Sequence, residues 1–149
     1  MPTMRFNHME LTVAPGALDE TLRADITRFY GEVFGWTATS VRIVGQDALL
    51  LMLDPEASQF ILVAESPNPM QSPGYDHLGL LLETRPEVDA LLARCRQWQE
   101  TDPRLRLKEY DDLVQGPVTV HAFYVKHLLP IWFDVQAMEW QPDAAPTRA

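Results

Sequence analysis

The sequence predicts an α+β fold in which the order strand, helix and three strands occurs twice. Three observations support this prediction: alternating apolar residues open each half, a segment with helical spacing follows, and three further strand-like segments complete it. Proline and glycine punctuate residues 67–74, between the halves. His8 and His77 open corresponding strands 69 residues apart, and residues 60–63 correspond to residues 131–134 at an offset of 71. A nearly constant offset indicates an internal duplication.

In the first half, apolar residues alternate with polar ones over residues 6–13, which predicts a strand. Apolar residues then recur at helical spacing from Leu18 to Val33, and Gly35 is expected to end this helix. Three strands are predicted over residues 37–44, 48–53 and 59–65. The turns between them fall at residues 45–47 and 54–56, which are rich in Gly, Asp and Pro.

The second half repeats this plan. Residues 76–82 predict a strand, and Thr84 and Glu87 have the spacing of a capping box, with Pro86 in the first turn of the following helix. The apolar face of that helix includes Cys95, and strands are predicted over residues 104–111, 117–126 and 131–138. We expect a single domain over residues 1–149, with module one at about 5–66, module two at about 75–138 and a frayed tail at 141–149. One module has too little core to fold alone, so the two are expected to pair their sheets.

The composition of the chain limits the classes of molecule that it is expected to bind. The chain has 149 residues and a net charge of -9 from 12 basic and 21 acidic residues, which disfavours nucleic acid and anionic membranes and suits a cationic small molecule. A single cysteine excludes an intrachain disulfide. We find no signal-peptide pattern and no long apolar run, so a cytoplasmic location is the default expectation.

A carboxylate interrupts the apolar strand at residues 130–136, where Asp134 follows Ile-Trp-Phe. Because a buried, unpaired charge is unfavourable, Asp134 needs a partner. Alternation places His8, His77 and Asp134 opposite the apolar faces of their strands. If the apolar faces pack on the helices, the three polar groups face a shared cavity, in the two-histidine, one-carboxylate pattern of Fe(II), Mn(II) and similar ions. The alternative is a metal-free site in which the three residues hydrogen-bond one another.

Four segments carry a family resemblance: residues 7–13, residues 29–36, residues 76–80, and the stretch from Phe123-Tyr124 to Asp134. On these segments the chain resembles the vicinal oxygen chelate superfamily, which includes glyoxalase I, extradiol dioxygenases, fosfomycin resistance proteins and bleomycin resistance proteins. The resemblance covers about residues 6–138. It implies tandem βαβββ modules that form a curved, mostly antiparallel eight-stranded sheet around a cleft.

The resemblance also implies roles for individual residues. His8, His77 and Asp134 fall at the positions of the family's metal ligands, with Asp134 one methylene shorter than the usual Glu. Tyr124, ten residues earlier, would donate a hydrogen bond or act as an acid. Val63 falls where glyoxalase I has a further ligand, which favours a three-ligand site.

Two further residues share these strand faces. Glu10 lies on the His8 face and could be a base, a partner of a ligand or an anchor for the substrate. Trp132 lies on the Asp134 face and could stack on a bound ligand. His121 alternates away from Tyr124, so the resemblance does not favour ring cleavage.

The expected function is therefore that of a small enzyme that depends on a divalent metal, Fe, Mn, Ni or Zn. Its substrate would be a small molecule that chelates the metal through vicinal oxygens, and the enzyme would be a lyase or isomerase, a dioxygenase or a transferase. The alternative is a metal-free protein that resembles the bleomycin resistance proteins and sequesters a small molecule. The resemblance also implies a homodimer.

Overall fold

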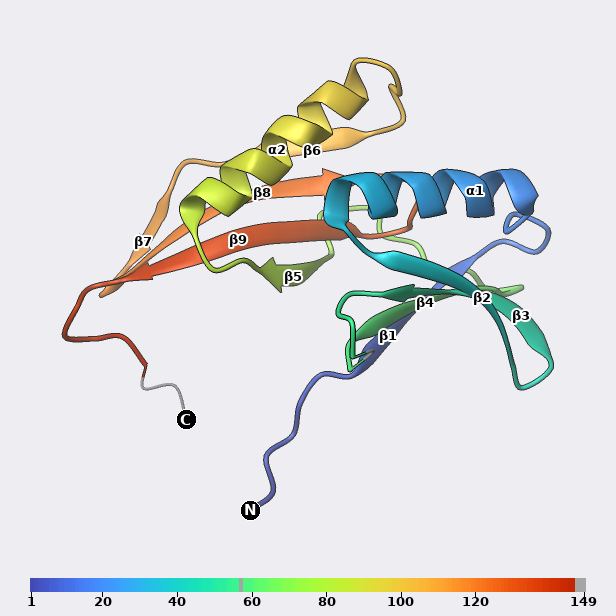
Figure 1. Ribbon diagram of the computed structural model, residues 1–149, viewed down its shortest axis with the longest axis horizontal. Coiled ribbons are helices and arrows are strands. Elements are labelled where there is room, and N and C mark those ends of the chain that lie inside the picture. Colours follow the sequence, from blue (N-terminus) through green and yellow to red (C-terminus); the bar gives the residue numbers. More distant parts are fainter. Residues whose placement is uncertain (57, 147–149) are drawn as a thin grey trace. The chain divides into compact units, whose positions relative to one another are not determined.

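The chain forms two compact units, each with its own sheet and helix (Figure 1). The computed structural model describes residues 1–56 and 58–146. The first unit comprises Met1–Ser72 with Leu128–Pro130, and the second comprises Pro73–His127 and the chain from Ile131 onward. The boundary at residues 72–73 falls in the predicted linker. Of the predicted tail, residues 147–149 lie outside the described residues.

The first unit holds a four-stranded sheet in the order β1-β4-β3-β2. Its elements are β1 (His8–Val13), α1 (Glu20–Phe29), the π-helix η1 (Tyr30–Phe34), β2 (Thr37–Ile43), β3 (Gln46–Met52) and β4 (Phe60–Glu65). β1 pairs with β4 in parallel, and the other pairs are antiparallel. Arg23 ties α1 to this sheet, because its guanidinium donates to the Ala48 carbonyl oxygen at 3.1 Å and to Ser40 Oγ at 3.3 Å.

The second unit holds a five-stranded sheet in the order β5-β9-β8-β6, with β7 paired to β8. Its elements are β5 (His77–Leu81), α2 (Arg85–Gln99), β6 (Arg106–Glu109), β7 (Leu113–Gln115), β8 (Val118–Lys126) and β9 (Trp132–Trp140). β5 pairs with β9 in parallel, and the remaining pairs are antiparallel. Helix α2 lies across one face of this sheet and contacts β6, β8 and β9 (Figure 1).

Each sheet has one apolar face whose central residues are buried, as the alternation predicts. In the first sheet the buried residues are Leu11, Leu49, Leu51, Ile61 and Val63, all at most 2% exposed. In the second they are Phe123, Val125, Phe133, Val135 and Ala137, all at most 1% exposed. Because neighbouring side chains on a strand point in opposite directions, His8 and Asp134 lie on the other faces of their sheets.

The helix ends follow the signals in the sequence. Asp19 caps α1 by accepting a hydrogen bond from the Leu22 N–H, and Gly35 ends η1 in the left-handed conformation at φ 74°. Thr84 and Glu87 form the predicted capping box at the start of α2. In these helices, local sequence and tertiary packing favour the same boundaries.

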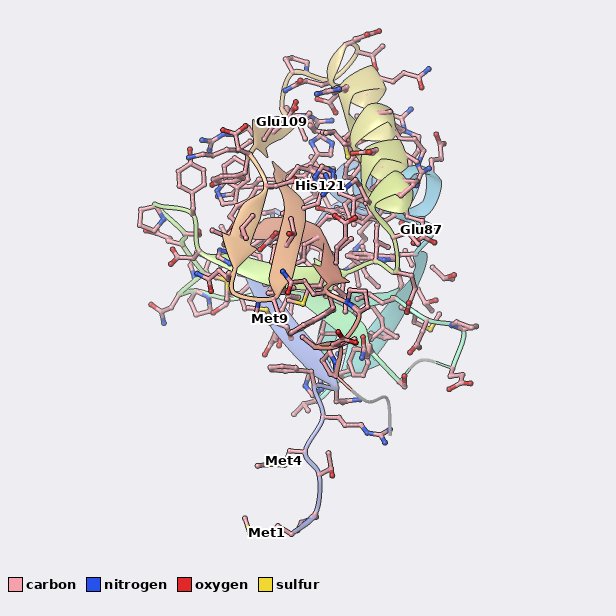
Figure 2. All side chains as sticks on the ribbon, turned by 90° about the vertical axis from the view of Figure 1, so that its left-hand side faces the viewer. Met1, Met4, Met9, Glu87, Glu109 and His121 are labelled. Carbon is pink, nitrogen blue, oxygen red and sulfur yellow. The ribbon has the colours of Figure 1, made fainter. Side chains whose placement is uncertain are left out.

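The predicted α+β fold class and the order of elements are confirmed, but the strands form two sheets, one in each unit, where one sheet was predicted, and the strand count differs by one. The described residues contain nine strands, because the predicted strand at 104–111 is shorter, Arg106–Glu109, and the next residues return to β8 as β7. The residues before β1 form no regular structure, and Met1 and Met4 are fully exposed there (Figure 2).

Replacing Gly35 by alanine should lower the free energy of unfolding by about 1 kcal/mol, because a Cβ disfavours φ 74°. Gly31→Ala is the matched control. Gly31 lies within η1, and an added Cβ would be at an ordinary 3.6 Å from the Trp36 carbonyl oxygen. Gly31→Ala should therefore change the stability by less than about 0.5 kcal/mol or raise it slightly. Urea denaturation of both variants checks this, and equal losses would contradict it.

Candidate functional site

Strand register brings His77, Tyr124 and Asp134 together on one face of the second sheet, the face opposite the buried apolar residues, here called the open face. Parallel pairing sets Gly79 beside Asp134 with His77 two residues earlier, on the same face, and antiparallel pairing sets Tyr124 beside Asp134. His77 Nε2 lies 3.8 Å from Asp134 Oδ2 and 3.4 Å from the Tyr124 hydroxyl oxygen. The three groups therefore form one polar cluster.

The Asp134 carboxylate is buried, with 9% of the residue exposed. Its Oδ1 atom is buried and has no hydrogen-bond partner, which is uncommon for a carboxylate oxygen. Burial raises the pKa of Asp134, although the nearby His77 and a hydrogen bond from Tyr124 oppose the increase. The ionised group is thus only partly compensated by protein atoms.

Both candidate histidines are held by the Nδ1 nitrogen. His77 Nδ1 lies 2.8 Å from the Tyr75 carbonyl oxygen, and His8 Nδ1 lies 2.7 Å from Asn7 Oδ1. If these oxygens accept a hydrogen bond from Nδ1–H, the neutral ring presents an unprotonated Nε2. Metal-binding histidines commonly have this arrangement.

His8 and Glu10 share a face of the first sheet. His8 is exposed and stacks on Phe60, with ring centroids 4.8 Å apart and an interplanar angle of 5°. Glu10 is exposed and lies beside Leu62 in the parallel pairing of β1 with β4. Within each unit, the described residues contain no group of three His, Cys, Asp or Glu side chains arranged to hold a metal ion.

The strand registers correct the expected correspondence between the modules. His8 pairs with Phe60 and His77 pairs with Trp132, so the residue corresponding to Asp134 is Leu62 at an offset of 72. Val63, which the offset of 71 selected, lies on the buried face with no exposed surface. Neighbouring residues on a strand point to opposite faces. The one-residue error in the predicted offset therefore selected a residue on the wrong face of β4. Leu62 is also apolar, so a fourth ligand is missing at this position in either alignment.

The Trp132 side chain lies beside this cluster and is covered by other side chains. It is 2% exposed, and its Nε1–H donates to the Gly74 carbonyl oxygen at 3.2 Å. The Arg106 guanidinium lies 4.9 Å above the indole ring, and the Tyr75 ring lies 5.1 Å from it. A ligand that approaches Trp132 in this conformation would meet Arg106 and Tyr75 first.

Sequence reasoning missed the groups that surround Trp132 and Tyr124. The Lys108 ammonium lies 4.0 Å above the Tyr75 ring and 5.1 Å from the Tyr110 ring, and Tyr110 packs on Tyr124 at 4.8 Å. Arg106 and Lys108 alternate within a predicted strand, so they could have been assigned to one face. The sequence did not show that this is the face of Tyr124, because that depends on how β6 pairs with β8.

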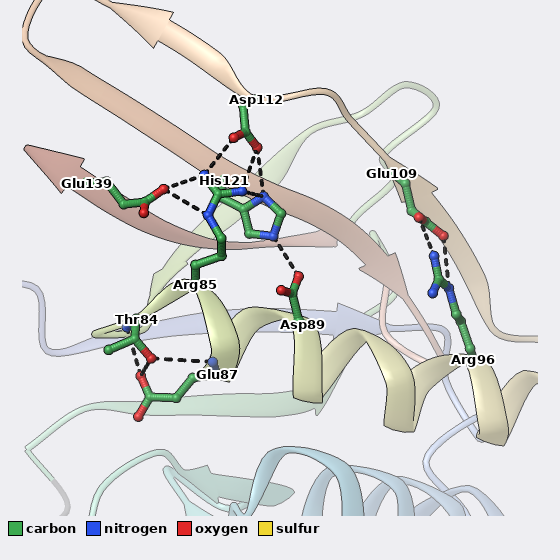
Figure 3. Close-up of polar contacts among 9 residues, drawn as sticks. All are labelled: Thr84, Arg85, Glu87, Asp89, Arg96, Glu109, Asp112, His121 and Glu139. Carbon is green, nitrogen blue, oxygen red and sulfur yellow. Dashed lines mark hydrogen bonds and ion pairs between the residues drawn. The ribbon is translucent and has the colours of Figure 1, made fainter.

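A second polar cluster lies on the α2 side of the same sheet (Figure 3). His121 Nδ1 lies 2.8 Å from Asp112 Oδ1, and His121 Nε2 lies 2.7 Å from Asp89 Oδ1. Arg85 contacts both Asp112 and Glu139. These pairs join α2 to β8, β9 and the segment before β7, which indicates a structural clamp.

A cavity of about 260 Å³ adjoins this clamp, lined by residues of α2, β6 and β8 that include Asp89, Arg96, Glu109 and His121. The Arg96 guanidinium pairs with the Glu109 carboxylate beside it (Figure 3). His121 lies on the face opposite Tyr124, as the alternation in β8 predicted. This cavity is therefore distinct from the His77, Tyr124 and Asp134 cluster.

Solved structures share this fold. A glyoxylase/bleomycin resistance protein/dioxygenase domain from Frankia sp. aligns with a TM-score of 0.57 at 18% identity, covering 94% of this chain and 100% of that one. A fosfomycin resistance protein, FosX, from Listeria monocytogenes was solved as a mutant with Mn(II) and dihydroxypropylphosphonic acid. It aligns at 0.58 and 14% identity, covering 90% and 92%. A glyoxalase/bleomycin resistance protein from Albidiferax ferrireducens aligns at 0.54 and 12%, covering 89% and 97%.

The predicted fold, shared with glyoxalase/bleomycin resistance/dioxygenase-type and fosfomycin resistance proteins, is thus confirmed. No protein-family model matches the sequence, and no curated protein matches it. Among the described residues, no helix is both long and apolar enough to span a membrane.

Replacing Asp134 by asparagine should leave the free energy of unfolding of metal-free protein unchanged or raise it by roughly 1 kcal/mol. Asparagine removes a buried, incompletely compensated charge and keeps the shape of the side chain. Asp47→Asn, at an exposed carboxylate paired with Arg42, is the control and should change stability little. Chemical denaturation in the presence of a chelator measures both. A loss above about 1 kcal/mol for Asp134→Asn would mean that the carboxylate itself supports the fold.

The clamp should make stability depend on pH through His121. Burial lowers the pKa of His121, but hydrogen bonds to Asp89 and Asp112 outweigh burial and raise it overall. A raised folded-state pKa gives stabilisation that is complete below the unfolded value, near 6.5, and is lost as the pH rises through the folded value. The stability advantage of the wild type over His121→Gln should therefore be largest near pH 6 and shrink toward pH 9.

Urea denaturation at several pH values measures this difference. Arg42→Gln, which removes one exposed cation and leaves the clamp intact, should keep the pH dependence of the wild type. A constant difference between wild type and His121→Gln across the range would show that the imidazole does not titrate against Asp89 and Asp112.

Proposed function

We propose that this protein is a small enzyme that depends on a divalent metal, with His8, His77 and Asp134 as the metal ligands. One observation carries the proposal: in the buried Asp134 carboxylate Oδ1 has no hydrogen bond, and Oδ2 lies 3.8 Å from His77 Nε2. If both groups are unprotonated at these atoms, two electron-rich atoms face each other. A divalent cation would compensate both of them. The donor set of imidazole and carboxylate suits Fe, Mn, Ni or Zn.

The protein's own groups would position the substrate and supply protons. When bound, the ion would polarise two vicinal oxygens of a small-molecule substrate as a Lewis acid. Burial, together with the nearby Asp134, raises the pKa of Tyr124, so its hydroxyl stays protonated near neutral pH. Tyr124 can therefore donate a hydrogen bond to a developing oxyanion or act as an acid. Glu10 is the candidate base, since it is exposed on the His8 face.

The comparisons support this class of reaction without choosing a substrate. A neighbour with the same fold, FosX, was solved with Mn(II) and a dihydroxy phosphonic acid. The apolar residues Leu62 and Val63 favour a three-ligand site over the four-ligand site of glyoxalase I. Lyase, isomerase, dioxygenase and transferase chemistry all remain compatible with such a site.

The alternative is a metal-free protein that binds and sequesters a small molecule. The net charge of -9 favours a cationic ligand in that case. On the open face, however, Arg106 and Lys108 already lie over the rings of Trp132 and Tyr75, which a cationic aromatic ligand would need. This occupation weighs against sequestration at this face. The homodimer implied by the family resemblance stays a prediction, which sedimentation equilibrium can test.

Metal analysis of the purified protein tests the proposal. We expect about one Mn, Fe, Ni or Zn ion per chain, and a loss of at least tenfold in metal affinity for His77→Ala, Asp134→Asn and His8→Ala. His121→Gln is the matched control, because His121 is likewise a histidine beside carboxylates but lies on the α2 side of the sheet. Circular dichroism confirms that each variant is folded. Wild-type protein that binds none of these metals, or full retention of metal by His77→Ala, would refute the proposal.

A further inference from the structure

Three cationic side chains gather on the open face of the second sheet. β6 pairs with β8 in a register that sets Arg106 beside Lys126 and Lys108 beside Tyr124. Because Tyr124 in turn pairs with Asp134, the residues Lys108, Tyr124 and Asp134 form one row across three strands. Among the strand residues described for this sheet, Asp134 is the single carboxylate on that face.

This gathering is unexpected in an acidic chain. The sequence contains two lysines, Lys108 and Lys126, and both lie on the open face although the net charge is -9. A local concentration of one charge sign raises the local concentration of the opposite ion. The open face is therefore suited to an anion, whereas the chain as a whole is not.

Arg106 and Lys108 also differ in their partners from several described arginines. Arg42, Arg85, Arg96 and Arg104 each pair with a carboxylate. Within residues 1–56 and 58–146, neither Arg106 nor Lys108 forms an ion pair with a carboxylate. Their contacts are the aromatic rings of Trp132, Tyr75 and Tyr110.

Aromatic contacts hold these cations in place without neutralising them. A ring face attracts an ammonium or guanidinium group but carries no net charge. An ammonium has three N–H donors and a guanidinium has five, so both can still donate to an anionic oxygen. Lys108 is also half-buried, which reduces the screening of its charge by solvent.

We propose that Lys108, supported by Arg106, binds an anionic group of the substrate, either a carboxylate or a phosphonate. The inference rests on the proposed function for the other end of the substrate, which would present its vicinal oxygens near His77 and Asp134. Adjacent strands are about 4.8 Å apart, so the backbones of Lys108 and Asp134 are separated by roughly 10 Å. The substrate is then a small, anionic, oxygen-rich molecule that bridges this row.

Anion binding to chelator-treated, full-length protein tests the inference separately from the metal. Methylphosphonate and acetate are titrated by calorimetry and by the change in tyrosine fluorescence, and their relative affinities distinguish the two anion chemistries. Lys108→Met should weaken binding of the preferred anion by roughly 10- to 100-fold. Lys108→Arg should retain most of the affinity. Arg42→Met, which removes an exposed cation of the first unit, should bind as the wild type does.

Each outcome bears on one proposal. Anion affinity that is equal in wild type and in folded Lys108→Met, or that falls equally in Arg42→Met, overturns the anion site. Metal content measured on the same samples tests the metal proposal alone, and Lys108→Met should keep it. If anion binding depends on Lys108 but the protein takes up no metal, the anion site is supported and the proposal of a metal-dependent enzyme is refuted.

Discussion

The burial of one carboxylate is the constraint around which the second unit is arranged. Strand β9 alternates core residues such as Phe133 and Val135 with Trp132 and Asp134, so the sheet cannot bury the first set without placing Asp134 on the open face. There the neighbouring side chains compensate its charge only in part: Oδ1 has no hydrogen bond, and Oδ2 lies 3.8 Å from His77 Nε2. Such an arrangement is unfavourable for folding alone, and it is common where a cation is to be bound.

Charged side chains have different kinds of partner on the two faces of this sheet. On the α2 side, His121 and Arg85 are matched with Asp89, Asp112 and Glu139, and these ion pairs fasten the helix to the strands (Figure 3). On the open face, cations rest on aromatic rings and a carboxylate oxygen lacks a partner. Matched charges serve structure, whereas unmatched charges that are held rigidly are available to a ligand. This contrast distinguishes the candidate site from the clamp, although each contains a histidine beside at least one carboxylate.

The duplicated modules differ at the positions that matter for chemistry. Each first strand begins with a histidine held through Nδ1, at His8 and at His77. Beyond that the modules diverge: the last strand of the second unit carries Asp134 where the first has Leu62, and Glu10 corresponds to Gly79. Because the backbone is repeated, corresponding side chains point in similar directions in the two units. The units differ in chemistry because different residue types occupy these corresponding positions.

The sequence by itself determined most of the elements, though not β7, together with their order and the faces of their side chains, because helix caps, turns and the alternation along a strand are local properties. It therefore predicted both the capping box at Thr84 and the direction of Asp134. The tertiary structure decided what depends on pairing between strands that are distant in the chain: the match of Asp134 to Leu62 instead of Val63, and the row that joins Lys108 to Tyr124. Register is set by packing and hydrogen bonding across the whole sheet, and no local pattern in the sequence contains it.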